Sequence, residues 1–366
     1  MKELEMAKMY VDDEIKKAVM DALDSRRYIK GEQNEKFEKE FAKFCGTKYA
    51  ITVNSGTSAL ILALKARGLK HNSEVIIPSH TFIASANAVF HAGLKPIFAD
   101  IDEETYTLDI EDVEEKITKD TRAIMPVHLY GHPANMEPLR GIAKENNLYI
   151  VEDACQAHGA MYKEQKCGAI GDIAAFSFFP SKNMTVSGDG GMVTTNNEEL
   201  AEKISALRDQ GRKKGEKYRH DLIGYNFRMS EIHATIGREQ LRHLSEWIEK
   251  RRRNAAYYNE LISDIKEIQT PMEKKWAKHV YHLYVIRSKE RDKLSRFLME
   301  KEIPFGIHYP IPVHQQPIFN EESIKLNKTE KIAREVLSLP MHPFMEEEQI
   351  EYIASKIKEF FREAKW

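Results

Sequence analysis

The sequence contains little cysteine, no long apolar run and no excess of charge. Its three cysteines, Cys45, Cys155 and Cys167, are too few and too scattered for a disulfide framework, and they are typical of a protein from a reducing compartment. The opening segment, MKELEMAKMYVDDEIKKAV, is charged and amphipathic without an apolar core, so it indicates neither a signal peptide nor a membrane span. We therefore expect a cytoplasmic protein that has no membrane partner.

The charges of the chain are almost balanced. Lys and Arg number 55 against 57 Asp and Glu, which gives a formal net charge of -2. This balance offers no general attraction to nucleic acid or to an anionic membrane. The basic runs EKRRRNAA and GRKKGEKYRH are predicted to form a solvated helix face and an exposed loop. With 42% hydrophobic residues over 366 positions, the chain is long enough for one large and one smaller folded domain.

Short apolar runs alternate with amphipathic, helix-like segments through the first two thirds of the chain. Examples of the helix-like segments are SALILALKARG and TLDIEDVEEKI. This alternation is typical of an α/β domain whose largely parallel sheet is covered on both faces. The expected strands are Tyr49–Val53, Glu74–Pro78, Lys95–Asp100, Arg122–Tyr130, Leu148–Asp153, Ile173–Phe179 and Gly190–Thr195.

The pattern changes near Met229. The segment SEIHATIGREQLRHLSEWIEKRRRNAAYYNELI predicts one long helix, or two abutting helices, that bridges two domains. Beyond it we expect a strand at His282–Arg287 and helices at ERDKLSRFLMEK and EEEQIEYIASKIKEFFREA, the last with an acidic start that suits a helix N-terminus. We predict a large α/β domain over residues 1–244, N-terminal helices included, and a smaller α+β domain over residues 245–366.

Polar residues that directly follow an apolar run are candidates for a site, because ligands of such sheets bind outside the carboxyl ends of the strands. In VNSGTSALILAL, Ser55, Gly56, Thr57 and Ser58 lie between an expected strand and a helical segment. The free amides of a helix N-terminus, a glycine that permits close approach, and hydroxyl donors together suit a phosphate group. The alternative is simple capping, because serine and threonine are also common helix caps.

Two adjacent carboxylates occur in YIVEDACQAHGA. Because Glu152 and Asp153 lie on or just after a strand, their side chains point to opposite faces and do not act as one pair. An aspartate at the end of a buried strand can hold a positive ring nitrogen of a cofactor, and the alternative is an aspartate that caps the following turn. Cys155 and His158 form an isolated C-x-x-H, which falls short of the three or four ligands that zinc needs, so no metal is predicted.

A lysine, Lys182, lies between an apolar run and a glycine cluster in FSFFPSKNMTVSGDGGMV. A lysine amine attacks carbonyl groups and forms a Schiff base once its environment lowers its pKa, and the alternative is a surface lysine in a loop. In PSHTFIASANAV, either Phe82 or His80 can lie against a cofactor ring or belong to ordinary core. A phosphate cradle, an acid for a ring nitrogen and an isolated lysine, in this order on an α/β chain, jointly indicate pyridoxal 5'-phosphate.

Six ordered motifs cover nearly the whole chain. They are GEQNEKFEKEFAKFCGTKYAITVNSGTSAL, IIPSHTFIASANAV, VEDACQAHGA, FSFFPSKNMTVSGDGGMV, IGYNFRMSEIHATIG and SLPMHPFMEEEQI. Through these motifs the chain resembles the sugar aminotransferases of the DegT or StrS family. The resemblance implies the fold-type I architecture of pyridoxal-phosphate enzymes, with a mostly parallel seven-stranded sheet in the large domain and a smaller C-terminal α+β domain.

The resemblance also implies roles for individual residues around the cofactor. Lys182 binds the cofactor covalently and then carries the proton, Asp153 pairs with the ring nitrogen, and Gln156 reaches the phenolic oxygen. Phe82 stacks on the ring. The phosphate group is held by Gly56, Thr57, Ser58 and Ser177.

Two further segments are implied to complete the site. Asn226, in GYNFRM, comes from a neighbouring subunit to the phosphate group, so the active form is a homodimer with shared active sites. His308 and Tyr309, in FGIHYPIPVHQQP, match a family segment near the sugar, and the alternative there is two turn residues beside prolines.

The implied reaction is ping-pong. An amino donor, commonly glutamate, loads the cofactor, which then aminates a keto sugar carried on a nucleotide, for the biosynthesis of amino sugars, surface polysaccharides or glycoconjugates. Two other classes are open: a non-catalytic regulator or binding protein that keeps the fold, and another fold-type I enzyme such as a lyase or desulfurase. Retention of Lys182, Asp153 and Gln156 favours transamination.

Overall fold

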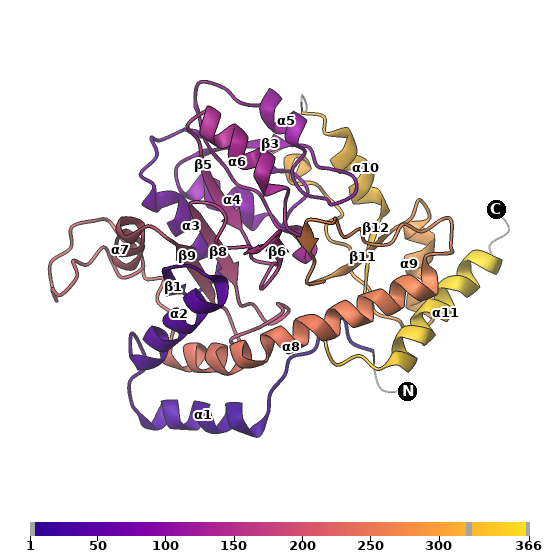
Figure 1. Cartoon of the computed structure of the whole chain (residues 1–366), viewed down its shortest axis with the longest axis horizontal. Helices are drawn as coiled ribbons and strands as arrows, with labels where there is room; N and C mark the ends of the chain where they lie inside the picture. The colour runs from indigo at the N-terminus through magenta and orange to yellow at the C-terminus, as the bar shows by residue number, and fades with distance from the viewer. Residues whose placement is uncertain (1–3, 320–323, 364–366) are drawn as a thin grey trace.

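The computed structural model describes residues 4–319 and 324–363. In this part of the chain, seven strands form one sheet in the spatial order β1-β9-β8-β5-β4-β2-β3 (Figure 1). The strand β9 runs antiparallel to both of its neighbours, and the remaining pairs are parallel. The strands are β1 (Tyr49–Val53), β2 (Glu74–Pro78), β3 (Lys95–Ala99), β4 (Thr121–Ile124), β5 (Tyr149–Asp153), β8 (Ile173–Ser177) and β9 (Gly191–Thr195). The predicted fold class, a mostly parallel sheet in an α/β protein, is confirmed.

One expected strand is much shorter than predicted. The run Arg122–Tyr130 was expected to be a single strand, but β4 ends at Ile124. Pro126 has no N–H with which to continue the ladder, and its carbonyl accepts a hydrogen bond from Asp153 instead. The chain then forms a single 3-10 turn, η1 (Leu129–Gly131), in which Tyr130 has a φ of 58°. This turn lies at the centre of the site described below.

Helices cover both faces of the sheet. On one face, residues such as Val151 of β5 pack in a core with α3 (Gly56–Ala66), α4 (Ala84–His91) and α7 (Glu198–Leu207). On the other, residues such as Ile150 pack with α2 (Glu32–Cys45), α5 (Ile110–Glu115), α6 (Met136–Glu145) and the first half of α8 (Glu231–Ile262). Because successive strand residues point to opposite faces, Ile150 and Val151 belong to different cores.

The predicted bridging helix is a single element. The helix α8 has 32 residues, and the hydroxyl of Ser230 caps its first turn by accepting from the His233 amide at 3.2 Å. Its first half lies against the large sheet, whereas Tyr258 and Ile262 in its second half belong to another core. Helix α1 (Asp13–Asp24) packs alongside it (Figure 1).

That other core gathers the C-terminal elements. It joins β11 (Tyr284–Arg287), β12 (Val336–Leu339), α9 (Arg291–Glu300) and α11 (Glu347–Glu363) to the end of α8. Shorter elements complete the description: β6 (Met161–Tyr162), β7 (Gln165–Lys166), β10 (Ala277–Lys278), η2 (Val313–Gln315) and α10 (Asn327–Glu335). The boundary proposed between residues 244 and 245 falls within α8, and the division into two domains stays a prediction.

A buried arginine fastens α8 to the C-terminal elements. Arg251 is 3% exposed, and its guanidinium donates to the carbonyls of Tyr281 at 3.1 Å and Met341 at 2.9 Å. Burial lowers the pKa of Arg251 to about 9. Among the described helices, none is long and apolar enough to cross a membrane.

Candidate functional site

Most of the predicted site residues lie at or just after the carboxyl ends of strands that run in the same direction. The central strand β5 ends at Asp153, β8 ends at Ser177, and β1 leads into α3 at Gly56. Parallel strands bring such ends to one edge of the sheet, where ligands bind in folds of this kind. The sheet order therefore gathers segments that are more than a hundred residues apart in the chain.

Asp153 is held in one orientation below this edge. Its side chain is 5% exposed, and its Oδ2 accepts a 2.8 Å hydrogen bond from the hydroxyl of Ser85 in α4. Its Oδ1 accepts from the backbone amide of Cys155 at 3.2 Å. The bond to the Cys155 amide caps the turn after β5, which was the alternative role expected for this aspartate. The carboxylate of Asp153 makes this bond and the bond to Ser85 at the same time.

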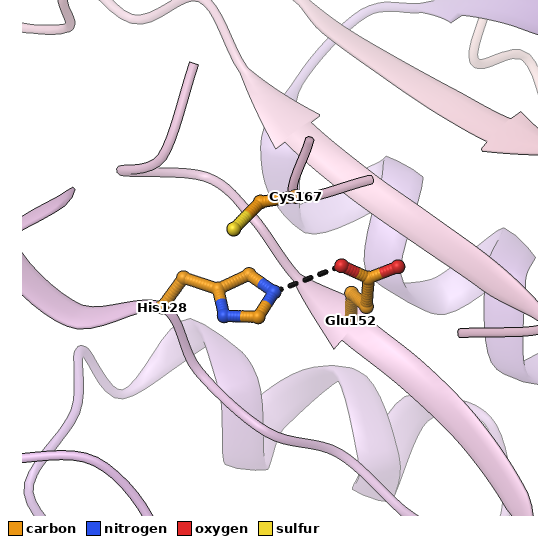
Figure 2. Close-up of side chains that lie close together, drawn as sticks. All are labelled: His128, Glu152 and Cys167. Carbon is orange, nitrogen blue, oxygen red and sulfur yellow. Dashed lines mark hydrogen bonds and ion pairs between the residues drawn. The ribbon is translucent and has the colours of Figure 1, made fainter. Parts of the chain in front are cut away.

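Glu152 points to the opposite face, as the strand alternation predicts. Figure 2 shows it beside His128 and Cys167, with a 2.9 Å bond between His128 Nε2 and Glu152 Oε2. The amides of Gly168, Ile170 and Gly171 also donate to the Glu152 carboxylate, at 2.8, 2.8 and 2.6 Å. Burial by itself would raise the pKa of Glu152, but these bonds outweigh it and hold the pKa below its usual value.

This buried cluster is a hydrogen-bonded anchor in which two of the three potential metal ligands, His128 and Glu152, already make hydrogen bonds. The other ring nitrogen of His128, Nδ1, accepts from the Ala134 amide at 2.9 Å, and both Glu152 oxygens accept hydrogen bonds. Burial raises the pKa of the Cys167 thiol, which disfavours the thiolate that metals bind. The cluster fixes β5 to the loop before β8 and thereby supports the neighbouring Asp153.

Lys182 has an amine that is open to reaction. Its backbone amide donates to the Phe179 carbonyl at 2.8 Å in a turn after β8. Within the described residues, its Nζ makes no hydrogen bond or ion pair. Burial lowers the pKa of Lys182, and the proximity of Cys155 and Asp153 opposes that effect. A lysine with a lowered pKa has more of the neutral amine, which is the nucleophilic form.

The predicted phosphate cradle is closely packed. The Ser55 hydroxyl caps α3 by accepting from the Ser58 amide at 3.0 Å, so the capping alternative holds for Ser55. A methyl group on Gly56 would lie 2.6 Å from Ser177 Cβ and 3.2 Å from Cys155 Sγ, so Gly56 and Ser177 are neighbours. The first amides of a helix have no carbonyl one turn earlier, and with the Ser58 amide bonded to Ser55, those of Gly56 and Thr57 remain at this junction.

Gln156 connects the strand end to a residue of the C-terminal part. Its side chain is 5% exposed, its Oε1 accepts from the Tyr130 amide at 2.7 Å, and its Nε2 donates to the Tyr309 hydroxyl at 3.1 Å. Phe82 lies beside Tyr309 with a ring-centroid distance of 5.8 Å. It is 53% exposed, which excludes ordinary core packing, whereas His80 is fully buried.

His308 and Tyr309 thus lie at the same edge of the sheet. His308 Nδ1 bonds the Ser338 hydroxyl at 2.8 Å, and the His308 carbonyl accepts from the Tyr130 hydroxyl. Burial and the Lys182 charge lower the pKa of His308, and burial raises that of Tyr309. The pair contacts Gln156, Phe82 and Tyr130, which the alternative of two turn residues does not require.

Asn226 is the predicted residue that the structure leaves apart. Its side chain is exposed, it forms a backbone bridge with Asp209, and no contact joins it to the other predicted residues in the described part of the chain. It belongs to a long connection after α7 that extends away from the body of the molecule (Figure 1). This connection carries two strongly exposed apolar side chains, Tyr218 at 83% and Ile223 at 96%.

Two residues of the site, Ser85 and Tyr130, were not predicted from the sequence. Ser85 lies one helical turn after Thr81, with which it shares a 3.0 Å hydrogen bond, and the hydroxyl spacing in SHTFIAS is a weak signal for it. Tyr130 was placed at the end of an expected strand, where its role as a partner of Gln156 was hidden. Pro126 in the same run is the signal that the strand ends early.

Comparison with known proteins shows which family has this arrangement. A Pleiotropic regulatory protein of Geobacillus stearothermophilus is 42% identical over 98% of this chain and 98% of its own length. The dTDP-3-amino-3,4,6-trideoxy-alpha-D-glucose transaminase of Streptomyces venezuelae is 43% identical over 94% of this chain and 91% of its own.

Solved structures agree in fold. The X-ray crystal structure of S. venezuelae DesV in complex with a ketimine intermediate matches with a TM-score of 0.92 and 42% identity, covering 95% of this chain and 94% of that one. The crystal structure of ntda from Bacillus subtilis with bound cofactor pmp matches with a TM-score of 0.90 and 30% identity, covering 99% and 87%. The model of the DegT/DnrJ/EryC1/StrS aminotransferase family matches residues 9–358, and the chain, which carries the motifs of that family on the family's fold, belongs to it.

Proposed function

We propose that this protein is a pyridoxal-phosphate-dependent aminotransferase that transfers an amino group from an amino acid to the keto group of a nucleotide-linked sugar. Glutamate is the expected donor. Membership of an aminotransferase family supports the reaction class, and similar proteins, which include dTDP-sugar transaminases and a GDP-perosamine synthase, support the acceptor class. The single observation that carries the proposal is the open amine of Lys182 close to the fixed carboxylate of Asp153.

The residues of this chain fit pyridoxal 5'-phosphate. A Cβ at Gly56 would lie 2.6 Å from Ser177 Cβ, so only glycine lets Ser177 pack against the start of α3, where backbone amides and hydroxyl groups would meet a phosphate. Asp153 suits a protonated ring nitrogen, and the amide of Gln156 suits the phenolic oxygen. The half-exposed ring of Phe82 offers an aromatic face for stacking. When bound, the cofactor supplies an aldehyde and an electron-withdrawing ring that stabilises negative charge at the substrate carbon.

Each residue of the site would then have a separate role in the reaction. Lys182 holds the cofactor through Nζ and, once the amino donor replaces it, is free to carry a proton from the carbon that bears the nitrogen. Asp153, fixed by Ser85, keeps the ring nitrogen charged through both half-reactions. Thr57 and Ser58 add hydroxyl groups to the amides of α3 around the phosphate.

The site is completed by a second copy of the chain in this proposal. Asn226 lies on an exposed connection with Tyr218 and Ile223, and large exposed apolar side chains support burial in an interface. In a homodimer, this connection would bring Asn226 to the phosphate group of the neighbouring subunit. His308 and Tyr309, beside Gln156, would face the sugar.

A non-catalytic regulatory function is the second candidate. The name of the Geobacillus stearothermophilus relative supports it. The presence of Lys182, Asp153 and Gln156 in one hydrogen-bonded setting argues against it, because a protein that only binds has no need of an open lysine amine.

The test is an absorbance spectrum of the purified protein with added pyridoxal phosphate, before and after borohydride, followed by peptide mass mapping. The proposal expects a visible band that borohydride fixes onto Lys182. It also expects amino-sugar formation from at least one member of a panel of dTDP-, UDP- and GDP-linked keto sugars with glutamate. A protein with neither the band nor a modified lysine is a binding protein, and the proposal fails.

A further inference from the structure

Tyr130 makes hydrogen bonds in three directions from one buried position. Its hydroxyl lies 2.7 Å from His80 Nε2 and donates to the carbonyl of His308, while its backbone amide donates to Gln156 Oε1 at 2.7 Å. Its backbone has a φ of 58°, which is an uncommon conformation for a residue other than glycine. A strained residue that makes several specific bonds is a candidate for a functional role.

The direction of these bonds follows from the state of His80. Burial lowers the pKa of His80 to about 3, so the ring is neutral at physiological pH and carries one proton. Because the Tyr130 hydroxyl donates its proton to the His308 carbonyl, it accepts from His80, which places the proton on His80 Nε2. His80 therefore orients the hydroxyl toward the His308 carbonyl.

The bonds form a closed circuit across the site. Tyr130 holds Gln156 through its amide, and Gln156 holds Tyr309 through its Nε2 at 3.1 Å. Tyr309 is joined to His308 by the chain, and the His308 carbonyl returns to the Tyr130 hydroxyl. The amide of Tyr130 therefore holds Gln156, and its hydroxyl holds His308, so that one residue closes the circuit at two points.

The turn that carries Tyr130 is itself attached to the C-terminal part. The Tyr130 carbonyl accepts from the Leu283 amide at 3.3 Å, and the Gly131 carbonyl accepts from the Val280 amide at 3.0 Å. Tyr130 therefore keeps its place through its backbone when its hydroxyl is removed. Its two functions can be separated by a change at that oxygen alone.

We propose that Tyr130 is a positioning residue whose hydroxyl holds His308 and Tyr309 against Gln156 and so places the acceptor sugar. The proposal rests on the proposed function, in which His308 and Tyr309 face that sugar. Loss of the hydroxyl weakens the acceptor half-reaction. The donor half-reaction persists, because the backbone amide still orients Gln156.

The chain offers a matched control for this hydroxyl. Tyr106 is buried beside Tyr130, with a ring-centroid distance of 5.7 Å. Its hydroxyl has no partner in good hydrogen-bonding geometry within the described residues, although it lies near the Arg287 guanidinium, and it does not join His80, Gln156 or His308. Tyr130→Phe and Tyr106→Phe therefore remove the same atom from adjacent buried rings, and the first change alone breaks the circuit.

The first measurement is hydrogen–deuterium exchange of the protein without cofactor or substrate. Tyr130→Phe is expected to increase exchange at the amides of residues 305–309 several-fold relative to wild type, and Tyr106→Phe is expected to leave it unchanged. Equal exchange in wild type and Tyr130→Phe overturns the proposal. Ser338→Ala, which releases His308 Nδ1 instead, is expected to loosen the same segment and serves as the second variant if Tyr130→Phe does not fold.

The second measurement separates the two half-reactions of the cofactor-loaded protein. The donor step is followed by absorbance with glutamate, and the acceptor step with whichever sugar of the panel wild type aminates. Tyr130→Phe is expected to lower kcat/KM for the sugar about tenfold and to change the donor rate by less than about twofold. Equal losses in both steps overturn the proposal. If the wild type aminates no sugar, the proposed function is overturned. The exchange measurement alone then tests whether the Tyr130 hydroxyl positions His308 and Tyr309.

Discussion

The hydroxyl of Ser85 donates a 2.8 Å hydrogen bond to Oδ2 of Asp153, so a residue of α4 sets the orientation of the carboxylate at the end of β5. Both side chains are buried, and Thr81 lies 3.0 Å from Ser85 on the other side. A hydrogen bond to a buried charged group is stronger than one between neutral groups. The orientation of Asp153 therefore depends on a residue that need not touch the cofactor.

Ser85→Ala is expected to slow the donor half-reaction about tenfold, because the carboxylate loses the bond that fixes it toward the ring nitrogen. The rate is measured by stopped-flow absorbance with glutamate. Ser295→Ala is the control, since Ser295 is a buried serine of α9 whose hydroxyl bonds only the carbonyl of Asp292. Equal rates in wild type and Ser85→Ala would show that Asp153 is oriented by other contacts.

Lys182→Ala is expected to remove the visible band of the bound cofactor and all turnover while the fold is kept, because the amine makes no contact on which the structure depends. Circular dichroism and borohydride labelling check the two halves of this prediction. Lys166→Ala, a second partly buried lysine whose amine bonds the Phe44 carbonyl, is expected to keep the band. Turnover by Lys182→Ala would remove this lysine from the mechanism.

Gly56→Ala is expected to lower the affinity for pyridoxal phosphate more than tenfold and to destabilise the protein by about 1–3 kcal/mol, because the new methyl lies 2.6 Å from Ser177 Cβ. Cofactor titration and urea unfolding measure the two effects. Gly141→Ala in α6 is the matched control: no atom lies within 4 Å of its new methyl, and it is expected to stabilise by about 0.5–1 kcal/mol. Unchanged cofactor affinity in Gly56→Ala would place the phosphate elsewhere.

Glu152→Gln is expected to destabilise the protein by about 3 kcal/mol at pH 7, because the amide cannot accept from His128 and three backbone amides as the carboxylate does. The pKa of Glu152 is lowered in the folded state. Its contribution is therefore complete above the unfolded-state pKa of about 4.3, and it is lost as the pH falls through the lower folded-state value.

Urea unfolding at a series of pH values tests this dependence. The difference between wild type and Glu152→Gln is expected to narrow below about pH 4. Glu137→Gln, which removes one partner of an exposed ion pair with Lys163, is expected to show no such difference at any pH. A chelator that lowered the unfolding midpoint of wild type would contradict the interpretation of the cluster as a hydrogen-bonded anchor.

Local patterns in the sequence predicted much of the fold. The runs Tyr49–Val53 and Glu74–Pro78 coincide with β1 and β2, because alternation and apolar content are properties of neighbouring residues. The spatial order of the strands was out of reach, since it depends on which strands pair across the sheet. The sequence also left open whether the bridging segment forms one helix or two. Packing against two cores keeps α8 a single helix.

The site likewise contains residues that local sequence patterns predict and residues that they do not. Asp153 and Lys182 stand out because their residue types are unusual at a strand end, and the family resemblance suggested Gln156. The bond between Tyr130 and His308 joins residues 178 positions apart, and no local pattern records it. Ser85 was overlooked for a related reason: a serine in a helix has many ordinary uses, and only its distance to Asp153 distinguishes this one.

The uninterrupted helix α8 couples the thermal unfolding of the two cores to which it contributes side chains. At about 1.5 Å per residue, its 32 residues form a rod roughly 48 Å long that contributes side chains to both cores. Melting of either core removes the packing that keeps half of the rod helical, and Arg251 in that rod also holds Tyr281 and Met341. Heating is therefore expected to give one calorimetric peak, with both cores unfolding at the same temperature.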